Sequence, residues 1–516
     1  MADLSNFPRM TLGINCVGDN YFDELTFYTN RAMASGWSRN SGDYSVIPPA
    51  NLDANGEIVS LPAGVTSVFR NAGRLSTSGA AGRITWANGG TSSFSYYGTG
   101  VTAGASSTNQ RDFTQTLDQQ PVDTDSARHR VVLQFGAVDL VNPPRAMKVV
   151  QQGDPDQLIH PDWLALHKPF RILRVLDWVK ANSNNVDGLT WAARTPPTHI
   201  SPASTPGGTP YEHLIEAANA IGADLWLPAP MGADDDYYTR MCMLLRDGPA
   251  GGEGLKGRLY LEWANEPWNP GLGTYTYALG KANAAGLSGA NSYGVGADLA
   301  KALRFQAQRS GQLMDIAASI FAPGRLVRVI GAQQTYAQVA DVLIEYGAAA
   351  RHDMLVCGGY YGNNAGTVPT TSNDPAVILP RIAADVDAME AVLIAHKAKA
   401  RAAGMRFGVY EWGQHFAKPG AMPLADFKAI QRRATMYDIT VDAARRVARH
   451  ADVGLYYSDV GPIVGQFAYG AKEYQEQPTA SAPKYDALID VIAAIKVADG
   501  RAARRRQLGL GIGLGL

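Results

Sequence analysis

The pattern of hydrophobic and polar residues divides the chain into parts of different character. Residues 10–17 form an apolar run typical of a buried strand, and the stretch from Asp23 to Gly36 begins with acidic residues and continues at helical spacing. From about Asn40 to Val150, short strand-like runs are separated by clusters of Gly, Ser, Asn and Thr. We therefore expect a first strand and helix followed by a β-rich insertion, a small sandwich.

From about Pro169 the chain alternates apolar runs with longer segments of helical spacing, which is typical of parallel βαβ units. Apolar stripes such as Leu299 with Leu303 predict the intervening helices. Including the first strand, the candidate strands are residues 11–17, 170–176, 223–229, 257–263, 325–331, 353–359, 406–412 and 453–459. They predict an α/β fold, a (β/α)8 TIM barrel, although an open doubly wound sheet would have the same pattern.

These patterns suggest four segments. Residues 1–39 supply the first barrel strand and helix, 40–150 the inserted β-rich domain, and 151–498 the remainder of the barrel. Residues 499–516 contain the basic run RAARRR followed by alternating Gly and Leu, and we separate them as a tail. The tail is either irregular or a contact for a larger assembly.

Composition and charge exclude several classes of protein. The sequence is 46% hydrophobic and 18% charged, as in an ordinary globular protein, and its net charge of -1 gives no field to attract nucleic acid. A neutral substrate is compatible with this charge. No apolar run reaches the roughly 18 residues of a membrane span. Because the first residues lack a secretory pattern, we expect a cytoplasmic protein as synthesised, with another export route or virus-particle association as alternatives.

The sequence predicts neither a metal nor an organic cofactor. Cys16, Cys242 and Cys357 are widely spaced, without the paired Cys/His spacing of a zinc site, and we expect each to be a small buried residue. No GxGxxG opens a predicted helix and no GxxxxGK[ST] occurs. The sequence therefore argues against a nucleotide-dependent α/β enzyme.

Two predicted strands end in glutamates flanked by aromatic residues. The run LYLEWANEPWNPG leads into Glu266 with Trp268 close behind, and the run RFGVYEW ends with Glu411 before Trp412. In a barrel both carboxylates would lie at the carboxyl ends of the strands, where such folds keep their chemistry. Two carboxyl groups about 5 Å apart can cleave a glycosidic bond with retention of configuration. The neighbouring aromatic rings could stack on sugar rings.

The segment WANEPWN resembles the Asn-Glu-Pro segment of the clan A glycoside hydrolases, a group that includes many cellulases, mannanases and β-xylosidases. The clan carries Asn-Glu at the end of strand 4 and a nucleophilic Glu at the end of strand 7, the same positions in our strand count. The resemblance implies that Glu266 is the general acid/base and Glu411 the nucleophile. It also implies that Asn265 contacts the sugar 2-hydroxyl group.

The resemblance suggests further site residues. An arginine on strand 2 often holds the nucleophile in this clan, and Arg174 is the best match, although a structural pairing with Asp177 is an equal alternative. A tyrosine after strand 6 often donates to the nucleophile, and Tyr360 or Tyr361 could do so. The two are adjacent, so only one should point inward.

Other positions depart from the clan pattern. Strand 8 ends in Tyr456 and Tyr457 where a tryptophan platform is usual, and we select Tyr456 as a sugar contact. After strand 3 many members have a histidine, whereas this chain has three aspartates, 234–236. We interpret His415 as a surface or core residue, with a position lining the site as the alternative.

Together these features predict a retaining glycoside hydrolase that acts on a β-linked poly- or oligosaccharide. The alternative is a non-catalytic carbohydrate-binding or assembly protein on the same scaffold, for example in a virus particle. The mechanism needs a protonated Glu266 beside an ionised Glu411. We expect Trp263 or Trp268 to desolvate Glu266, while Arg174 and a tyrosine stabilise the charge of Glu411.

Overall fold

The computed structural model describes residues 4–18, 25–39, 46–76, 78–117, 130–183, 187–363 and 373–511, with side chains described as far as residue 499. Eight parallel strands close into a barrel in chain order, which confirms the TIM-barrel prediction and excludes the open sheet. The barrel strands are β1 (Thr11–Asn15), β10 (Ile172–Arg174), β11 (Asp224–Ala229), β12 (Leu259–Trp263), β13 (Leu326–Ala332), β14 (Met354–Tyr361), β15 (Arg406–Gln414) and β16 (Val453–Tyr456).

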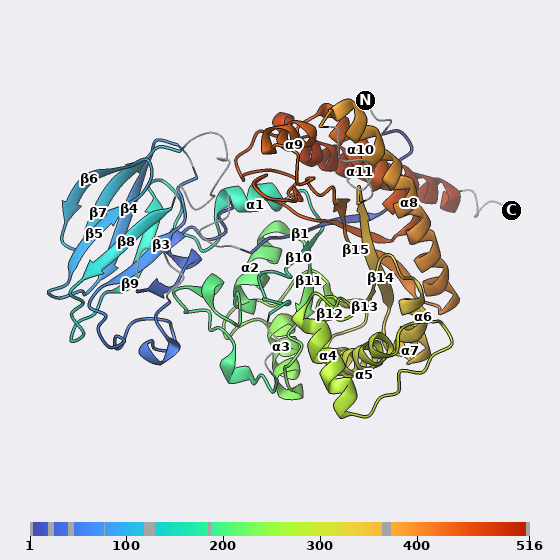
Figure 1. The fold of residues 1–516 in the computed structure, drawn as a ribbon, viewed down its shortest axis with the longest axis horizontal. Coiled ribbons are helices and arrows are strands. Elements are labelled where there is room, and N and C mark those ends of the chain that lie inside the picture. The colour runs from blue at the N-terminus through green and yellow to red at the C-terminus, as the bar shows by residue number, and fades with distance from the viewer. Residues whose placement is uncertain are drawn as a thin grey trace.

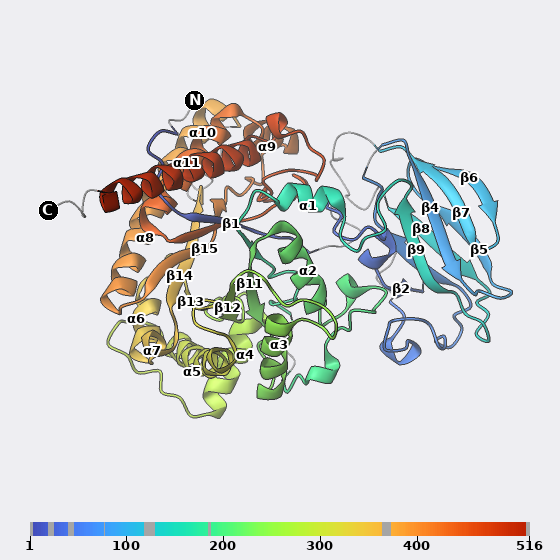
Figure 2. The ribbon, with the colours of Figure 1, turned by 180° about the vertical axis from the view of Figure 1, so that it is seen from behind.

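Helices surround these strands, as Figures 1 and 2 show from opposite sides. Because both faces of a parallel strand are covered in such a fold, the strands are apolar runs rather than alternating ones, and β12 is buried at every position. Long helices such as α5 bury their stripe of small and aliphatic residues against the barrel. The helices are α1 (Pro161–His167), α2 (Tyr211–Ile221), α3 (Asp235–Asp247), α4 (Gly273–Ala284), α5 (Ala297–Ile320), α6 (Gln338–Glu345), α7 (Ala348–Arg351), α8 (Pro375–Ala402), α9 (Leu424–Gln431), α10 (Ala434–His450) and α11 (Pro483–Gly511).

Between β1 and α1 the chain forms two four-stranded sheets of antiparallel strands, which lie to one side of the barrel (Figure 1). One sheet has the order β2-β3-β8-β5 and the other β6-β7-β4-β9, and a shared apolar core includes Trp37, Phe113 and Phe135. The predicted sandwich-like insertion is thus present. Its strands are β2 (Trp37–Ser38), β3 (Val68–Ala72), β4 (Ala80–Ala87), β5 (Ser93–Tyr97), β6 (Val101–Ser107), β7 (Gln110–Gln115), β8 (Val131–Gly136) and β9 (Arg145–Gln151).

The first predicted helix, residues 23–36, is wrong over its described part. Residues 25–29 contain no helical turn, and only the short 3-10 helix Arg31–Ala34 follows. The apolar residues are buried for another reason: Phe27 packs edge-on against Trp163 and Trp178, and Tyr28 pairs with Ile159 in an isolated bridge. Tertiary packing of a connecting segment therefore imitates a helical stripe.

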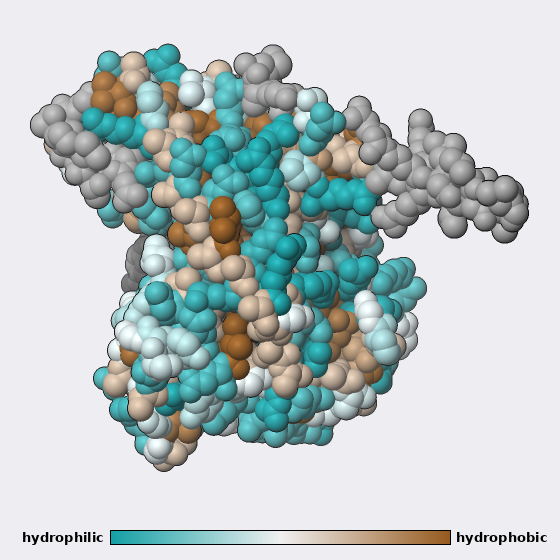
Figure 3. Space-filling view, turned by 90° about the vertical axis from the view of Figure 1, so that its right-hand side faces the viewer, coloured by the Kyte–Doolittle hydropathy of each residue, from teal (hydrophilic) through white to brown (hydrophobic). Residues whose placement is uncertain are grey.

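Helix α11 continues to Gly511, through most of the segment 499–516 that the sequence separates as a tail. On the face in Figure 3, hydrophobic residues occur in small groups among hydrophilic ones. Within the described ranges, no helix has the length and apolar composition needed to cross a membrane.

Candidate active site

Glu266 follows the end of β12 on a backbone bend that few residues adopt. Ala264 and Glu266 have φ values of 58° and 45°, in the left-handed region that is unfavourable for residues other than glycine. Such conformations cost on the order of 1–3 kcal/mol each and concentrate at functional sites. The bend carries Asn265 and Glu266 past the strand end. Glu266 is partly exposed there, and it accepts hydrogen bonds from the Tyr410 hydroxyl at 2.6 Å and the Asn269 amide at 2.9 Å.

Glu411 lies in β15 at an irregularity of the sheet. Val409 pairs with Cys357 of β14, but the next pair joins Glu411 to Gly358, so Tyr410 is an extra residue on its strand. A β-bulge of this kind interrupts the alternation of side chains between two faces. Tyr410 and Glu411 consequently both line the same pocket although they are neighbours in sequence.

Arg174, at the end of β10, joins the parts of the site. Its side chain is completely buried. Nη1 donates to Glu411 at 2.5 Å and to Asn15 at 3.0 Å, while Nη2 donates to Asn265 at 2.7 Å and to Glu262 at 3.1 Å. One cation thus holds two buried carboxylates and the amide next to Glu266.

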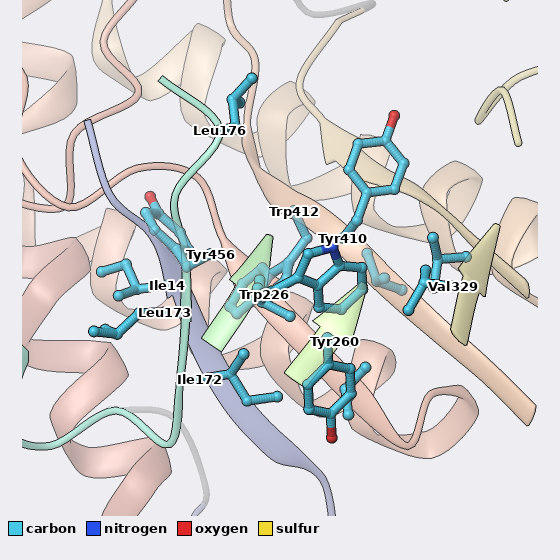
Figure 4. Packing of buried hydrophobic residues seen from close by; sticks show 14 of the residues in the cluster. Ile14, Ile172, Leu173, Leu176, Trp226, Tyr260, Val329, Tyr410, Trp412 and Tyr456 are labelled. Carbon is cyan, nitrogen blue, oxygen red and sulfur yellow. The ribbon is translucent and has the colours of Figure 1, made fainter. Parts of the chain in front are cut away.

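The arginine is itself held by the barrel interior. The Glu262 carboxylate also accepts from the Trp226 indole at 3.0 Å, and Trp226 stacks on Tyr260 with ring centroids 5.4 Å apart. Figure 4 shows these rings among the buried side chains between the strands. Burial opposes the charged guanidinium, but Glu262 and Glu411 together raise the pKa of Arg174 above its ordinary value. It therefore remains a cation.

Glu411 has a perturbed titration. Burial, the largest cause, raises its pKa from 4.5 to about 7, and the charge of Glu266 adds to this. Arg174 and the Tyr360 hydroxyl, which donates to the carboxylate at 2.6 Å, act in the opposite direction. The expectation that Arg174 and a tyrosine contact Glu411 agrees with these bonds, but burial outweighs their effect on the pKa of Glu411.

The two glutamates line one cavity of about 470 Å³ at the carboxyl ends of the strands, within the usual size range of small-ligand sites. The side chains around it are mostly amides and aromatic rings. The lining residues are Leu176, Asn182, Asn265, Glu266, Trp268, Asn269, Leu272, Gln333, Gln334, Thr335, Tyr360, Asn363, Tyr410, Glu411, His415, Tyr457 and Tyr469.

Trp412 and Tyr456, expected to contact sugar, and Tyr361, the alternative to Tyr360, lie outside the pocket lining. Trp412 and Tyr456 are completely buried and pack edge to face, with ring centroids 5.0 Å apart (Figure 4). Tyr361 is also buried, and the cavity lining includes none of the three. After the bulge in β15, the alternation of side chains directs Trp412 away from the pocket. Of the two adjacent tyrosine pairs, Tyr360 and Tyr457 line the pocket, whereas their neighbours Tyr361 and Tyr456 do not.

Sequence reasoning missed several residues of the site. Nothing in the sequence except its place beside Glu411 points to Tyr410, and Glu262, which lies in β12 four residues before Glu266, is not among the predicted site residues. His415, expected at the surface or in the core, lines the pocket and packs beside Tyr360 and Tyr469, with centroids 5.2 and 5.3 Å away. A carboxylate inside an otherwise apolar strand was the available signal for Glu262.

One cluster has the residue types of a metal site. Cys16, His167 and Asp459 are all buried, with candidate ligand atoms within 4.8 Å of one another. However, His167 already contacts the Trp163 carbonyl at 2.8 Å and Asp459 at 2.9 Å. Asp459 also accepts hydrogen bonds from two backbone N–H groups, that of Val17 after β1 at 3.0 Å and that of Val460 after β16 at 2.7 Å. These bonds give the cluster a structural role that joins the two loops.

Comparisons with known proteins concern the fold alone. No family model and no curated protein matches the sequence. Solved structures similar to this chain include the GH51 arabinofuranosidase from Xanthomonas axonopodis pv. citri, with 13% identity over 61% of this chain and a TM-score of 0.41. The aligned part spans 63% of that enzyme. A family 51 α-L-arabinofuranosidase from Bifidobacterium longum gives 13% identity, 65% and 68% coverage, and a TM-score of 0.42.

A third similar structure is the endo-β-1,4-mannanase from Thermotoga petrophila. It has 11% identity and covers 65% of this chain and 72% of its own, with a TM-score of 0.30. Likenesses of this size do not bear on activity. The chemistry of this chain has to be inferred from its own side chains.

Proposed function

We propose that this protein is a retaining glycoside hydrolase that cleaves β-linked sugars through a glycosyl-enzyme intermediate. The observation that carries the proposal is the pairing of Glu266 and Glu411 in one cavity, each with a different set of partners. A partly exposed Glu266 suits a group that must exchange protons with water. A deeper Glu411, held by Arg174 and Tyr360, suits a nucleophile with a fixed direction of attack.

In the first step, Glu266 protonates the leaving oxygen while a carboxylate oxygen of Glu411 attacks the anomeric carbon and the glycosidic bond breaks. In the second, Glu266 removes a proton from water, which attacks the same carbon and releases Glu411. In this proposal Asn265, whose Oδ1 accepts from Arg174 and whose Nδ2 donates to Asn182, uses its second N–H to donate to the sugar 2-hydroxyl group. The mechanism requires carboxyl groups about 5 Å apart.

Replacing each glutamate with alanine should block a different step of the reaction. With a 4-nitrophenyl glycoside, whose leaving group needs little protonation, Glu266→Ala should form the glycosyl-enzyme and then stall. Azide should rescue turnover and give a product of retained configuration. Glu411→Ala should fail at the first step, and azide should give the inverted product. The configuration of the glycosyl azide is read by NMR, with the exposed Glu253→Ala as the control variant.

Three outcomes would count against this assignment. The reverse pattern of azide products would exchange the two roles. If the wild type and Glu411→Ala hydrolysed the 4-nitrophenyl glycoside at the same rate, the two-carboxylate mechanism would be ruled out. Binding of oligosaccharides without cleavage of any β-glycoside would leave the alternative of a non-catalytic carbohydrate-binding protein.

A further inference from the structure

The pocket wall is rich in side chains that both donate and accept hydrogen bonds. Six carboxamides of the described residues line it. Four of them already bond protein groups, but each amide nitrogen has two N–H groups and each oxygen two lone pairs, so a sugar hydroxyl, itself both donor and acceptor, can use those that remain. Aromatic rings of Tyr457 and Tyr469 complete the wall, 5.2 Å from each other. The six carboxamides are Asn182, Asn265, Asn269, Gln333, Gln334 and Asn363.

No lysine or arginine is among the described residues that line this pocket. The segments 184–186 and 364–372, which come shortly after Asn182 and Asn363, contain no lysine, arginine or histidine in the sequence. Arg174 lies directly behind the wall, but its terminal nitrogens already bond four side chains and none of its surface is exposed. No guanidinium or ammonium group is therefore offered to a ligand by this part of the chain.

The one imidazole on the wall does not replace a cation. Burial lowers the pKa of His415 below its ordinary value of 6.5, which favours the neutral ring near pH 7, although Glu266 acts in the opposite direction. The pocket therefore presents two carboxyl groups and neutral hydrogen-bonding groups. An anionic ligand would be repelled by any ionised glutamate and would give up its hydration without a counter-ion.

We infer that the pocket selects uncharged sugars and rejects uronic acids and sulfated sugars at the residue whose bond is cleaved. This inference rests on the proposed glycosidase function and deepens it. A cation directed at the acid group makes the strong contact with an anionic sugar, because a hydrogen bond between two ionised groups is about twice as strong as a neutral one. Here the amides match hydroxyl groups, and the charges of the wall have the wrong sign for an acid.

The test uses sugars that differ only at C6. The wild-type protein is assayed with two pairs of 4-nitrophenyl β-glycosides, glucoside against glucuronide and galactoside against galacturonide, at low salt. We expect kcat/KM for the better neutral glycoside to exceed that of its uronide partner at least 100-fold. A uronide cleaved as fast as its neutral partner would overturn the inference.

A charge-reversal variant shows whether charge sets this preference. Thr335 is exposed on the pocket wall and takes part in none of the proposed steps. Thr335→Lys should narrow the preference for the neutral sugar at least fivefold at low salt and less at high salt, since salt screens exposed charges. The matched variant Thr335→Gln, of similar length but neutral, should leave it unchanged. An equal preference in both variants would overturn the inference.

Binding separates this inference from the proposed function. Saturation-transfer NMR with the Glu266→Gln variant measures contact with methyl glucoside, galactoside and their uronate partners without requiring turnover. If no β-glycoside is cleaved but the neutral sugars receive saturation and the uronates do not, the hydrolase proposal fails and the charge selectivity stands. Saturation of the uronates at equal or greater strength, or of no sugar at all, would refute the selectivity itself.

Discussion

Arg70 in the sandwich and Arg174 in the barrel are both completely buried, yet they meet different acceptors. Arg70 donates to the main-chain carbonyls of Ala32 at 2.6 Å and Ile200 at 2.5 Å, and to the Ser201 hydroxyl at 3.0 Å. Arg174 donates to carboxylates and amides of the pocket. The first arginine ties the sandwich to a barrel loop, and the second organises the proposed chemistry.

Their titrations record the same difference. Burial lowers the pKa of Arg70 to about 10, because the charge of Glu57 compensates only in part. For Arg174 the two carboxylates outweigh burial and raise the pKa. A buried cation that donates to neutral carbonyls thus has a structural role. A buried cation that donates to carboxylates can hold reactive groups in position, but it also concentrates charge inside the barrel.

The largest effect should come from Arg174→Gln. This change leaves Glu262 and Glu411 buried without a cation and releases Asn265, so we expect kcat/KM to fall on the order of 10³-fold or more and stability to fall by roughly 3–5 kcal/mol. Steady-state kinetics and urea unfolding measure the two effects. Arg171→Gln is the matched control, because Arg171 is exposed at the start of the same run. A similar loss in both variants would mean that Arg174 has no special role.

Arg70→Met should instead affect stability alone. The carbonyls of Ala32 and Ile200 would lose a buried donor, which we expect to cost about 2–4 kcal/mol of folding free energy. Turnover of a small aryl glycoside by the folded protein should remain within about twofold. Arg83→Met is the control, since Arg83 pairs with Asp112 at the solvent-accessible surface, where ion pairs contribute little to stability. A large loss of activity without unfolding would show that the two regions are functionally coupled.

Glu411→Gln should stabilise the fold at high pH. The folded pKa is raised from 4.5 to about 7, so stability is lost as pH rises between these values, by up to roughly 3 kcal/mol. The neutral amide cannot ionise and avoids this loss. We expect the variant to gain about 1–3 kcal/mol over the wild type at pH 8 and little at pH 4.5. Thermal unfolding of both proteins at the two pH values measures this difference in stability. A variant less stable than the wild type at pH 8 would contradict the raised pKa of Glu411.

The smallest effect should come from Glu262→Gln. The amide oxygen still accepts from Trp226, but Glu411 no longer shares Arg174 with a second carboxylate. The carboxylate form of Glu411 should then be favoured, and the rising limb of kcat/KM against pH should move from near 7 to lower pH by about half a unit. A purely structural role for Glu262 would lower the rate without moving the limb. Glu253→Gln should leave the profile unchanged.

The sequence by itself determined the order of the barrel strands, the β-rich insertion and the position of two glutamates at strand ends. These features depend on local periodicity and on the rule that carboxyl ends of parallel strands meet at one rim. The same reasoning failed for residues 25–36, which form no α-helix; Phe27 is instead buried by tertiary contacts with Trp163 and Trp178.

Only the tertiary structure decided which of two adjacent residues faces the pocket. The bulge at Tyr410 depends on how β15 pairs with β14 and β16. It brings Tyr410 and Glu411 to the wall of the same pocket, while Trp412 is buried in the hydrophobic core. Likewise, Glu262 became part of the site only when folding brought it within 3.1 Å of Arg174. Pairing register, burial and charge sharing arise between residues far apart in sequence, so no local pattern encodes them.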